Sequence, residues 1–175
     1  MALNNTYSLT HQPYSPGMVA DARLTQTVSR IASAAIKAGQ AAVRDNNDHK
    51  VKPVSAANDV VIGVVRWEAT WVAADGATEQ VHAIGKDVSV VTDGPVWVHA
   101  TVAVKQGELA YALTDGSGFT NVATSAATRP VGIFDTSTTG AGAAIVNQNP
   151  ATTAPAASQG IINEYQFTTG SSQGR

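Results

Sequence analysis

Short apolar stretches separated by turn residues run through most of the chain. Apolar side chains alternate with polar ones over a few residues at a time, which is the period of a half-buried strand. The pattern predicts strands over residues 40–44, 60–71, 81–83, 88–91, 96–104, 108–113, 131–134 and 143–146. We expect turns at Asp75-Gly76, Asp93-Gly94 and Asp115-Gly116, because Asp and Gly tolerate left-handed backbone. The fold predicted is mainly β: a single small β-barrel or a jelly-roll-like β-sandwich.

Residues 22–38 fit two interpretations. Leu24, Val28, Ile31 and Ala35 make an apolar stripe at helical spacing, whereas residues 28–31 also suit a strand. Gly39 ends the segment in either case, since glycine adopts positive φ at little cost.

The two ends of the chain differ from its centre, which predicts three parts. Residues 1–21 contain His-Gln-Pro-Tyr-Ser-Pro-Gly at 11–17 and read as an extended N-terminal arm with apolar anchors. Residues 22–147 are the expected β-rich core domain. Residues 148–175 begin with a Pro/Ala/Thr-rich linker and continue into a strand-like tail, Ile-Ile-Asn-Glu-Tyr-Gln-Phe at 161–167.

An internal echo links two parts of the core. Residues 36–43 (Ile-Lys-Ala-Gly-Gln-Ala-Ala-Val) match residues 104–111 (Val-Lys-Gln-Gly-Glu-Leu-Ala-Tyr), and each is followed by a glycine among apolar residues, Gly63 and Gly132. The echo predicts two related pieces of sheet, each with a glycine turn that leads into a strand.

Three tryptophans are the main candidates for packing or recognition. Trp97 lies among valines and is expected in the core. Trp67 and Trp71 are four residues apart, which places both on one face of a strand. Trp71, near a predicted turn, is the better candidate for an interface.

Catalytic and metal-binding motifs are not found. The four histidines have no metal-binding spacing, there is no cysteine, and Gly140-Ala-Gly142 lacks the third glycine and the helix of a phosphate cradle. The Gly-Xaa-Ser-Xaa-Gly elbow of serine hydrolases is also missing. We therefore expect no enzyme activity, no cofactor and no resident metal.

Charge and hydropathy limit the classes of partner. The net charge is −2 and charged residues make up 14% of the chain, with no basic footprint for nucleic acid. No apolar run approaches the roughly 20 residues of a membrane-spanning helix, and residues 1–20 do not resemble a signal peptide. We expect a protein made in the cytosol whose partners are proteins, with no nucleic acid and no membrane.

The order of several short motifs resembles the structural cement or capsid decoration proteins of tailed bacteriophages. The matching segments are 14–21 (Tyr-Ser-Pro-Gly-Met-Val-Ala-Asp), 35–43, 63–65 (Gly-Val-Val), 94–98 (Gly-Pro-Val-Trp-Val), 104–111, 130–135 (Pro-Val-Gly-Ile-Phe-Asp) and 142–146 (Gly-Ala-Ala-Ile-Val). The resemblance covers roughly residues 1–147 and leaves the tail without a counterpart.

The resemblance implies a virion structural protein on the outer surface of the capsid. It would bind the major capsid protein, clamp neighbouring subunits against the pressure of packaged DNA, and associate with itself as a homodimer or homotrimer. The expected contact residues share an aromatic or apolar side chain on an arm, a tail or a turn: Tyr7, Leu9, Tyr14, Pro16, Met18, Trp71, Tyr165 and Phe167.

An alternative function comes from a different class of phage protein. A tail-fibre or receptor-binding module would recognise a host glycan through exposed aromatic side chains. In that interpretation Trp71 and Tyr111 would line the groove.

Overall fold

The computed structural model describes residues 14–68 and 79–148. All the regular secondary structure in these residues is β-strand. The strands are β1 (Gln26–Ala32), β2 (Ile36–Lys37), β3 (Ala41–Arg44), β4 (Lys50–Pro53), β5 (Val61–Val65), β6 (Val81–His82), β7 (Asp87–Ala100), β8 (Leu109–Leu113), β9 (Phe119–Thr120), β10 (Ala127–Phe134) and β11 (Gly142–Gln148). The prediction of a mainly β, barrel-like fold is confirmed. Among these residues no helix is suited to cross a membrane.

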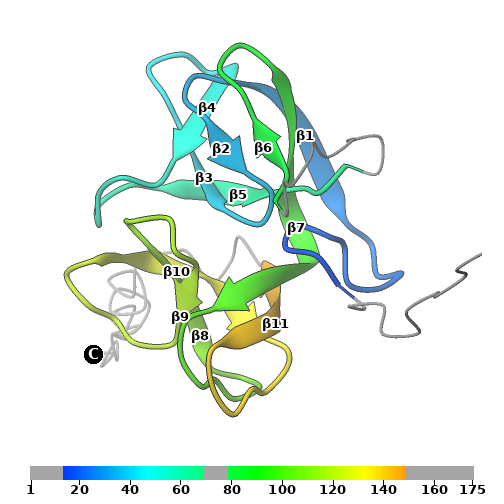
Figure 1. Cartoon of the computed structure of the whole chain (residues 1–175), viewed down its shortest axis with the longest axis vertical. Helices are drawn as coiled ribbons and strands as arrows, with labels where there is room; N and C mark the ends of the chain where they lie inside the picture. The colour runs from blue at the N-terminus through cyan, green and yellow to red at the C-terminus, as the bar shows by residue number, and fades with distance from the viewer. Residues whose placement is uncertain (1–13, 69–78, 149–175) are drawn as a thin grey trace, which may run out of the picture.

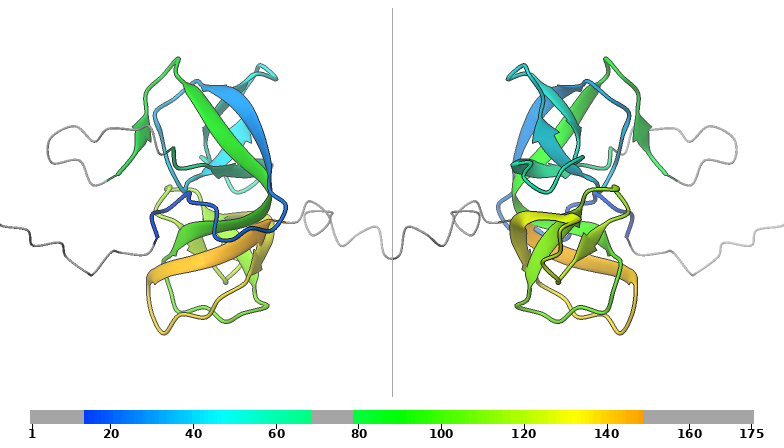
Figure 2. Two further views of the ribbon diagram at one scale, coloured as in Figure 1. Left: turned by 90° about the vertical axis from the view of Figure 1, so that its right-hand side faces the viewer. Right: turned by 90° about the vertical axis from the view of Figure 1, so that its left-hand side faces the viewer.

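The strands close into two rings, each of five strands, that share β7. In the first ring the order is β1-β4-β3-β5-β7, and β7 pairs back onto β1. In the second ring the order is β7-β11-β10-β8-β9, and β9 pairs back onto β7. Figure 1 shows the first barrel above the second, and Figure 2 shows β7 passing from one to the other.

Strand β7 corrects one prediction from the sequence. Asp93-Gly94 was expected to be a turn between two strands, but both residues lie inside β7. Residues before Gly94 pair with β1 and β5, and residues from Gly94 onward pair with β11. Gly94 has a φ of 111°. Because its two flanks are held by different barrels, its left-handed backbone redirects the strand where it passes between them.

Each barrel has its own buried interior, and the two interiors correspond position by position. The cluster in the first barrel is Ala32, Ile36, Ala42, Val51, Val65, Val88 and Val90. The second barrel buries Ala100, Val104, Ala110, Phe119, Phe134, Ala144 and Val146. Taken in chain order, the two sets match in their pairing. The parallel pairs β1-β4 and β7-β9 join the first and fourth members of each set, and the antiparallel pairs β5-β7 and β10-β11 join the fifth and seventh.

The internal echo is confirmed in the hydrogen bonds of the two turns. In the first turn the backbone N–H of Lys37 donates to Gln40 Oε1 at 2.9 Å, and Gly39 N–H donates to Val65 O at 2.8 Å. In the second turn the N–H of Lys105 donates to Glu108 Oε2 at 2.8 Å, and Gly107 N–H donates to Phe134 O at 2.8 Å. The chain is therefore a tandem repeat of one barrel unit.

The structure resolves the ambiguous segment 22–38 in favour of strands β1 and β2. Along β1 the side chains of Val28, Arg30 and Ala32 are less exposed than those between them, which is a period of two. Pairing with β7 and β4 satisfies its backbone, and this tertiary pairing overrides the helical spacing of Val28 and Ile31.

Several strand boundaries also differ from the predictions. Strand β5 ends at Val65, so Trp67 follows the strand, and β7 merges two predicted strands and ends at Ala100. Strands β4 and β9 were not predicted. The predicted Asp75-Gly76 turn lies outside the described residues.

Candidate interaction surface

The last part of the predicted arm pairs with the middle of β7. Gly17 N–H donates to Trp97 O at 2.7 Å, Trp97 N–H donates to Met18 O at 2.9 Å, and Ala20 N–H donates to Pro95 O at 3.0 Å. Val19 forms an antiparallel bridge with Val96. Residues 17–20 are therefore held by backbone hydrogen bonds at the junction of the two barrels.

An aromatic stack fixes the start of this docked segment. The rings of Tyr14 and Trp97 lie 4.5 Å apart between centroids and are inclined by 21°. Trp97 was expected in the core, but it points outward from β7 and is half-buried. Its flat face is an apolar platform that Tyr14 partly covers.

We predict that Tyr14→Ala loosens the docked segment. Loss of a stacked aromatic pair is worth about 1 kcal/mol, so the segment should open more often. Limited proteolysis should then cleave faster between residues 14 and 25, and tryptophan fluorescence should shift as the Trp97 face becomes hydrated. Tyr14→Phe keeps the ring and serves as the control. Equal cleavage rates for native protein and Tyr14→Ala would contradict the prediction.

Gly17 has no side chain, which allows the docked segment to lie close to β5, to β7 and to the turn at Gly39. Its φ is 88°, and a Cβ atom on it would lie 2.6 Å from Val65 O and 2.8 Å from Gly39 N. Its own carbonyl accepts a hydrogen bond from Trp67 N–H at 2.9 Å. A larger residue would separate the arm from the end of β5.

The predicted contact residues fall into two groups. Pro16 is exposed, whereas Tyr14 and Met18 are half-buried and Met18 Sδ accepts a hydrogen bond from Ser15 N–H at 3.2 Å. The others lie outside the described residues: Tyr7, Leu9, Trp71, Tyr165 and Phe167. The structure thus brings Tyr14, Pro16 and Met18 together at one place.

An exposed ionic cluster joins the chain after the arm to the second barrel. Arg23 forms ion pairs with Asp21, at 2.7 Å, and with Asp135. The hydrogen bond from the Arg23 side chain lowers the pKa of Asp21, and its hydrogen bonds with Asp21 and Asp135 raise the pKa of Arg23. Asp21 and Arg23 are therefore both charged at neutral pH. Any stability that the Asp21 carboxylate contributes is lost as the pH falls and the carboxylate is protonated.

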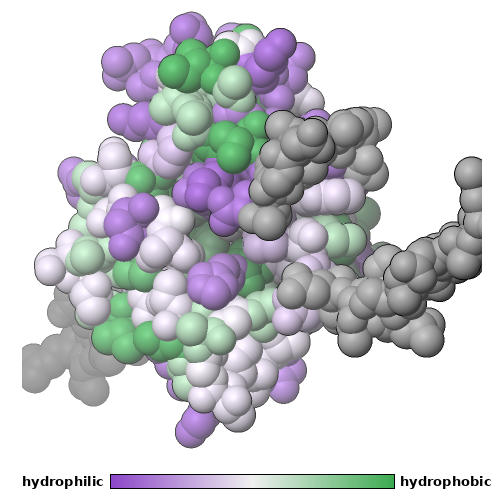
Figure 3. Space-filling view, in the orientation of Figure 1, coloured by the Kyte–Doolittle hydropathy of each residue, from purple (hydrophilic) through white to green (hydrophobic). Residues whose placement is uncertain are grey.

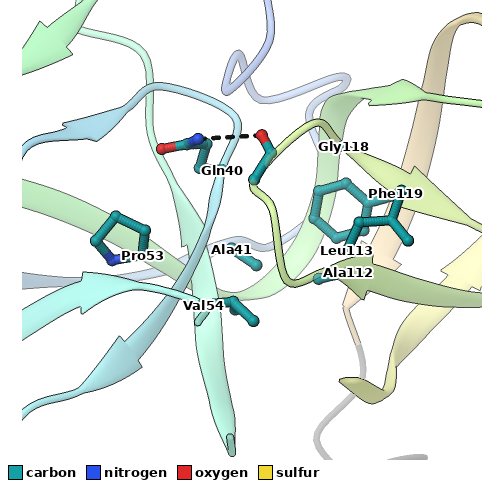
Figure 4. Close-up of a pocket in the computed structure, with 9 residues that line it drawn as sticks. Gln40, Ala41, Pro53, Val54, Ala112, Leu113, Gly118 and Phe119 are labelled. Carbon is teal, nitrogen blue, oxygen red and sulfur yellow. Dashed lines mark hydrogen bonds between the residues drawn. The ribbon is translucent and has the colours of Figure 1, made fainter. Parts of the chain in front are cut away.

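The two barrels contact each other through one outer face of the first barrel. A cavity of about 10 Å³ remains between them, lined from the first barrel by Gln40, Ala41, Pro53 and Val54. The hairpin between β8 and β9 covers this face, and the Gln40 side chain donates to Gly116 O at 3.1 Å, as Figure 4 shows. The barrel–barrel contact is thus mainly apolar, and Gln40 supplies a polar anchor within it.

A larger groove of about 350 Å³ lies beside this contact. Its walls include Pro16 from the arm, Glu79, His99 and the segments 37–40 and 116–118. Tyr111 is not among its lining residues. In the described part of the chain, no cluster of His, Asp and Glu suits a metal ion.

Comparison with known protein families decides which class this architecture represents. Residues 3–149 match the family model of the structural cement protein (E217 gp24/Pam3 gp6). The chain belongs to this family of phage structural proteins. The match spans both barrels of the cement protein and the docked segment, and it ends one residue after β11. A search of curated proteins finds no match.

Exposed apolar residues on the cement protein were missed by the sequence reasoning. The described ones with large exposed side chains are Leu24, Ile31, Val60, Val81, Ile84, Val102, Leu109 and Val122. The alternation of exposed Leu109 and buried Ala110 in β8 shows which residues project from the same side of the strand. It does not show whether another part of the protein covers the side that carries Leu109. A comparison of the two echoed segments would have singled out Leu109, since its counterpart is Ala41.

Proposed function

We propose that this cement protein binds the outer surface of a phage capsid and joins neighbouring subunits of the major capsid protein. The family match over residues 3–149 carries the proposal. The structure supports it with two barrels fixed on one strand, a form suited to bridging, and with residues 17–20 docked at their junction. The net charge of −2 favours protein partners over nucleic acid.

The proposed mechanism is stabilisation by binding to the assembled shell. A protein that binds the expanded shell but not dispersed subunits shifts the equilibrium toward the shell by mass action. Many copies on a symmetric lattice add their small contributions, and self-association as a dimer or trimer would add avidity. The contacts proposed are Tyr7, Leu9, Tyr14, Pro16, Met18, Trp71, Tyr165 and Phe167.

Co-sedimentation with expanded capsids stripped of the protein tests the proposal. We expect saturable binding at a stoichiometry set by the lattice, together with a higher melting temperature of the shell. Failure of the native protein to bind would contradict the proposal, and binding to a glycan array would then favour a receptor-binding module.

Deleting residues 1–13 tests the arm separately from the barrels. This deletion keeps Tyr14 and the hydrogen bonds of residues 17–20, so the barrels should remain folded. We expect at least tenfold weaker binding to shells, because two predicted contacts, Tyr7 and Leu9, are removed. A deletion of residues 168–175, which keeps Tyr165 and Phe167, is the control for loss of chain length. Unchanged affinity after removal of residues 1–13 would refute the role of Tyr7 and Leu9.

A further inference from the structure

The second barrel has an added strand at one edge of β7. Residues 17–20 form this strand, and their backbone is hydrogen-bonded to Pro95 and Trp97. Val19 lies opposite Val96 and packs against the buried cluster of the second barrel. An extended segment thus covers β7 ahead of the point where β9 pairs with it.

The tandem repeat places residues 27–29 of β1 at the positions of residues 95–97. Ala32 and Ala100 are equivalent, and each strand runs parallel to the strand that closes its ring, β4 in the first barrel and β9 in the second. Counting back three to five residues from each alanine gives the two matching segments. Residues 27–29, which we call the β1 edge, are therefore the first barrel's counterpart of the site where the arm docks.

The backbone of Thr27 and Ser29 points away from β7. Successive N–H groups of a strand point to opposite edges, so Thr27, Ser29 and Ile31 share one direction. Ile31 N–H donates to His49 O at 2.9 Å, on the side where β4 lies. Because β4 pairs with β1 only at Ile31 and Ala32, no described strand pairs with the β1 edge on this side.

The side chains at the β1 edge are less buried than those under the docked arm. Thr27 and Ser29 are exposed and Val28 is half-buried, whereas the equivalent Pro95 and Val96 are buried. Val28 also packs against the core cluster of the first barrel. A strand added here would complete the burial of an apolar side chain and pair the backbone, as the arm does on β7.

Arg30 places a positive charge beside the β1 edge. It takes the position of the buried Val98 of the second barrel, and its side chain is half-buried. Its Nη1 donates to Ser29 O at 3.0 Å, and its Nε is buried without a hydrogen-bond partner among the described residues. An incoming N–H would take over Ser29 O, as Gly17 N–H does at Trp97 O, and release the guanidinium for a carboxylate.

The hairpin between β3 and β4 extends the positive charge along this edge. It lies beside β1 because His49 O accepts the hydrogen bond from Ile31 N–H. Figure 3 shows hydrophilic residues at the end of the first barrel, where Figure 1 shows this hairpin. The charge around the β1 edge complements an acidic segment. Cations outnumber carboxylates in the hairpin: Arg44, Lys50 and Lys52 against Asp45 and Asp48.

We propose that the β1 edge binds an extended acidic segment of the major capsid protein by strand addition. The segment runs antiparallel to β1, with an aliphatic residue over Val28 and a carboxylate on Arg30. The inference rests on the proposed function and names a contact for it. Residues 17–20 of a second copy are not free for this role, because its own β7 holds them.

Proline at Ser29 tests the backbone pairing. Ser29→Pro removes the N–H that points to the open edge, and it keeps the pairing of β1 with β7 because proline is tolerated at an edge position. We expect at least tenfold weaker binding to expanded shells stripped of the protein. Ser29→Ala keeps the N–H and is the matched control, with native affinity expected. Circular dichroism and thermal unfolding check that both variants fold.

A charge reversal tests the chemistry of the segment. Arg30→Glu should weaken shell binding at least tenfold, because it places a carboxylate against an acidic partner. Lys86→Glu makes the same change of charge on an exposed residue of the first barrel and should bind as the native protein does. Native affinity for Arg30→Glu would refute the acidic character of the segment.

A photo-cross-linker identifies the occupant of the β1 edge. The native chain has no cysteine, so Ser29→Cys can carry a benzophenone at a single place. Irradiation on stripped shells should join it to one peptide of the major capsid protein, and mass spectrometry should find acidic residues in that peptide. The same label on Ile84→Cys, at an exposed residue between β6 and β7, should not capture that peptide.

The outcomes separate this contact from shell binding itself. Native binding together with unchanged binding of Ser29→Pro would overturn the strand addition and leave the proposed function standing. Capture of residues 149–175 or of a second copy by the label at residue 29 would overturn the capsid protein as the occupant. Failure of the native protein to bind shells would refute the proposed function and this contact with it.

Discussion

Replacing Phe134 by alanine is expected to lower the free energy of unfolding by about 4 kcal/mol. Phe134 is fully buried in the second barrel, where Ala110 and Ala144 belong to the same cluster. These small neighbours have no side-chain length with which to fill the space, so a cavity should remain. Urea denaturation followed by circular dichroism measures the change.

The control for this substitution is Ile84→Ala, because an exposed side chain contributes little to stability. Its expected effect is below about 0.5 kcal/mol. A loss below about 1 kcal/mol for Phe134→Ala would contradict the packing described for the second barrel.

Adding one methyl group at either of two equivalent glycines should destabilise the protein by about 3 kcal/mol. A Cβ atom on Gly63 would lie 2.0 Å from Val91 O, and one on Gly132 would lie 2.3 Å from Asn147 O. Both distances are far below contact, and the obstacle in each case is the backbone of the next strand. Gly63→Ala and Gly132→Ala should therefore separate paired strands in the first and second barrels, respectively.

Gly140→Ala is the matched control for both glycine substitutions. A Cβ atom on Gly140 meets nothing within 4 Å. Thermal unfolding should show large losses for Gly63→Ala and Gly132→Ala and almost none for Gly140→Ala. Equal melting temperatures for the three variants would show that the strands are not in this close contact.

The repeat could be predicted from the sequence because it depends on local chemistry. Gly39 and Gly107 supply positive φ, and Gln40 and Glu108 each supply the oxygen that accepts the N–H of the lysine three residues earlier. These residues are close together in the chain, so they can be read as a motif. Ring closure depends on pairs such as Ala100 with Phe119, which no local pattern indicates.

Strand β7 shows why local signals can mislead. Asp and Gly at 93–94 have the composition of a turn, but a turn needs the chain to reverse. Here the residues on both sides pair with strands of different barrels, and these pairings keep one continuous strand that Gly94 redirects but does not reverse. Strand β9 was missed for the opposite reason, because its two residues are too few to show a period.

The candidate surface was only partly accessible to sequence reasoning. Aromatic and apolar residues marked Tyr14 and Met18, but the stack of Tyr14 on Trp97 joins residues far apart in the chain. The exposure of apolar residues depends on what covers each barrel. Ala41 and Leu109 occupy equivalent positions, and only the arrangement of the barrels makes one buried and the other exposed.

A strand that belongs to two closed rings leaves no place for a hinge between them. Strand β7 runs unbroken from Asp87 to Ala100, and hydrogen bonds hold it on both sides of Gly94. The distance between the two barrels should therefore be constant. The protein then fits only partner sites that are separated by that distance. Under the proposed function, a lattice with incorrectly spaced subunits would engage one barrel at a time, and the protein would discriminate between shells by their dimensions.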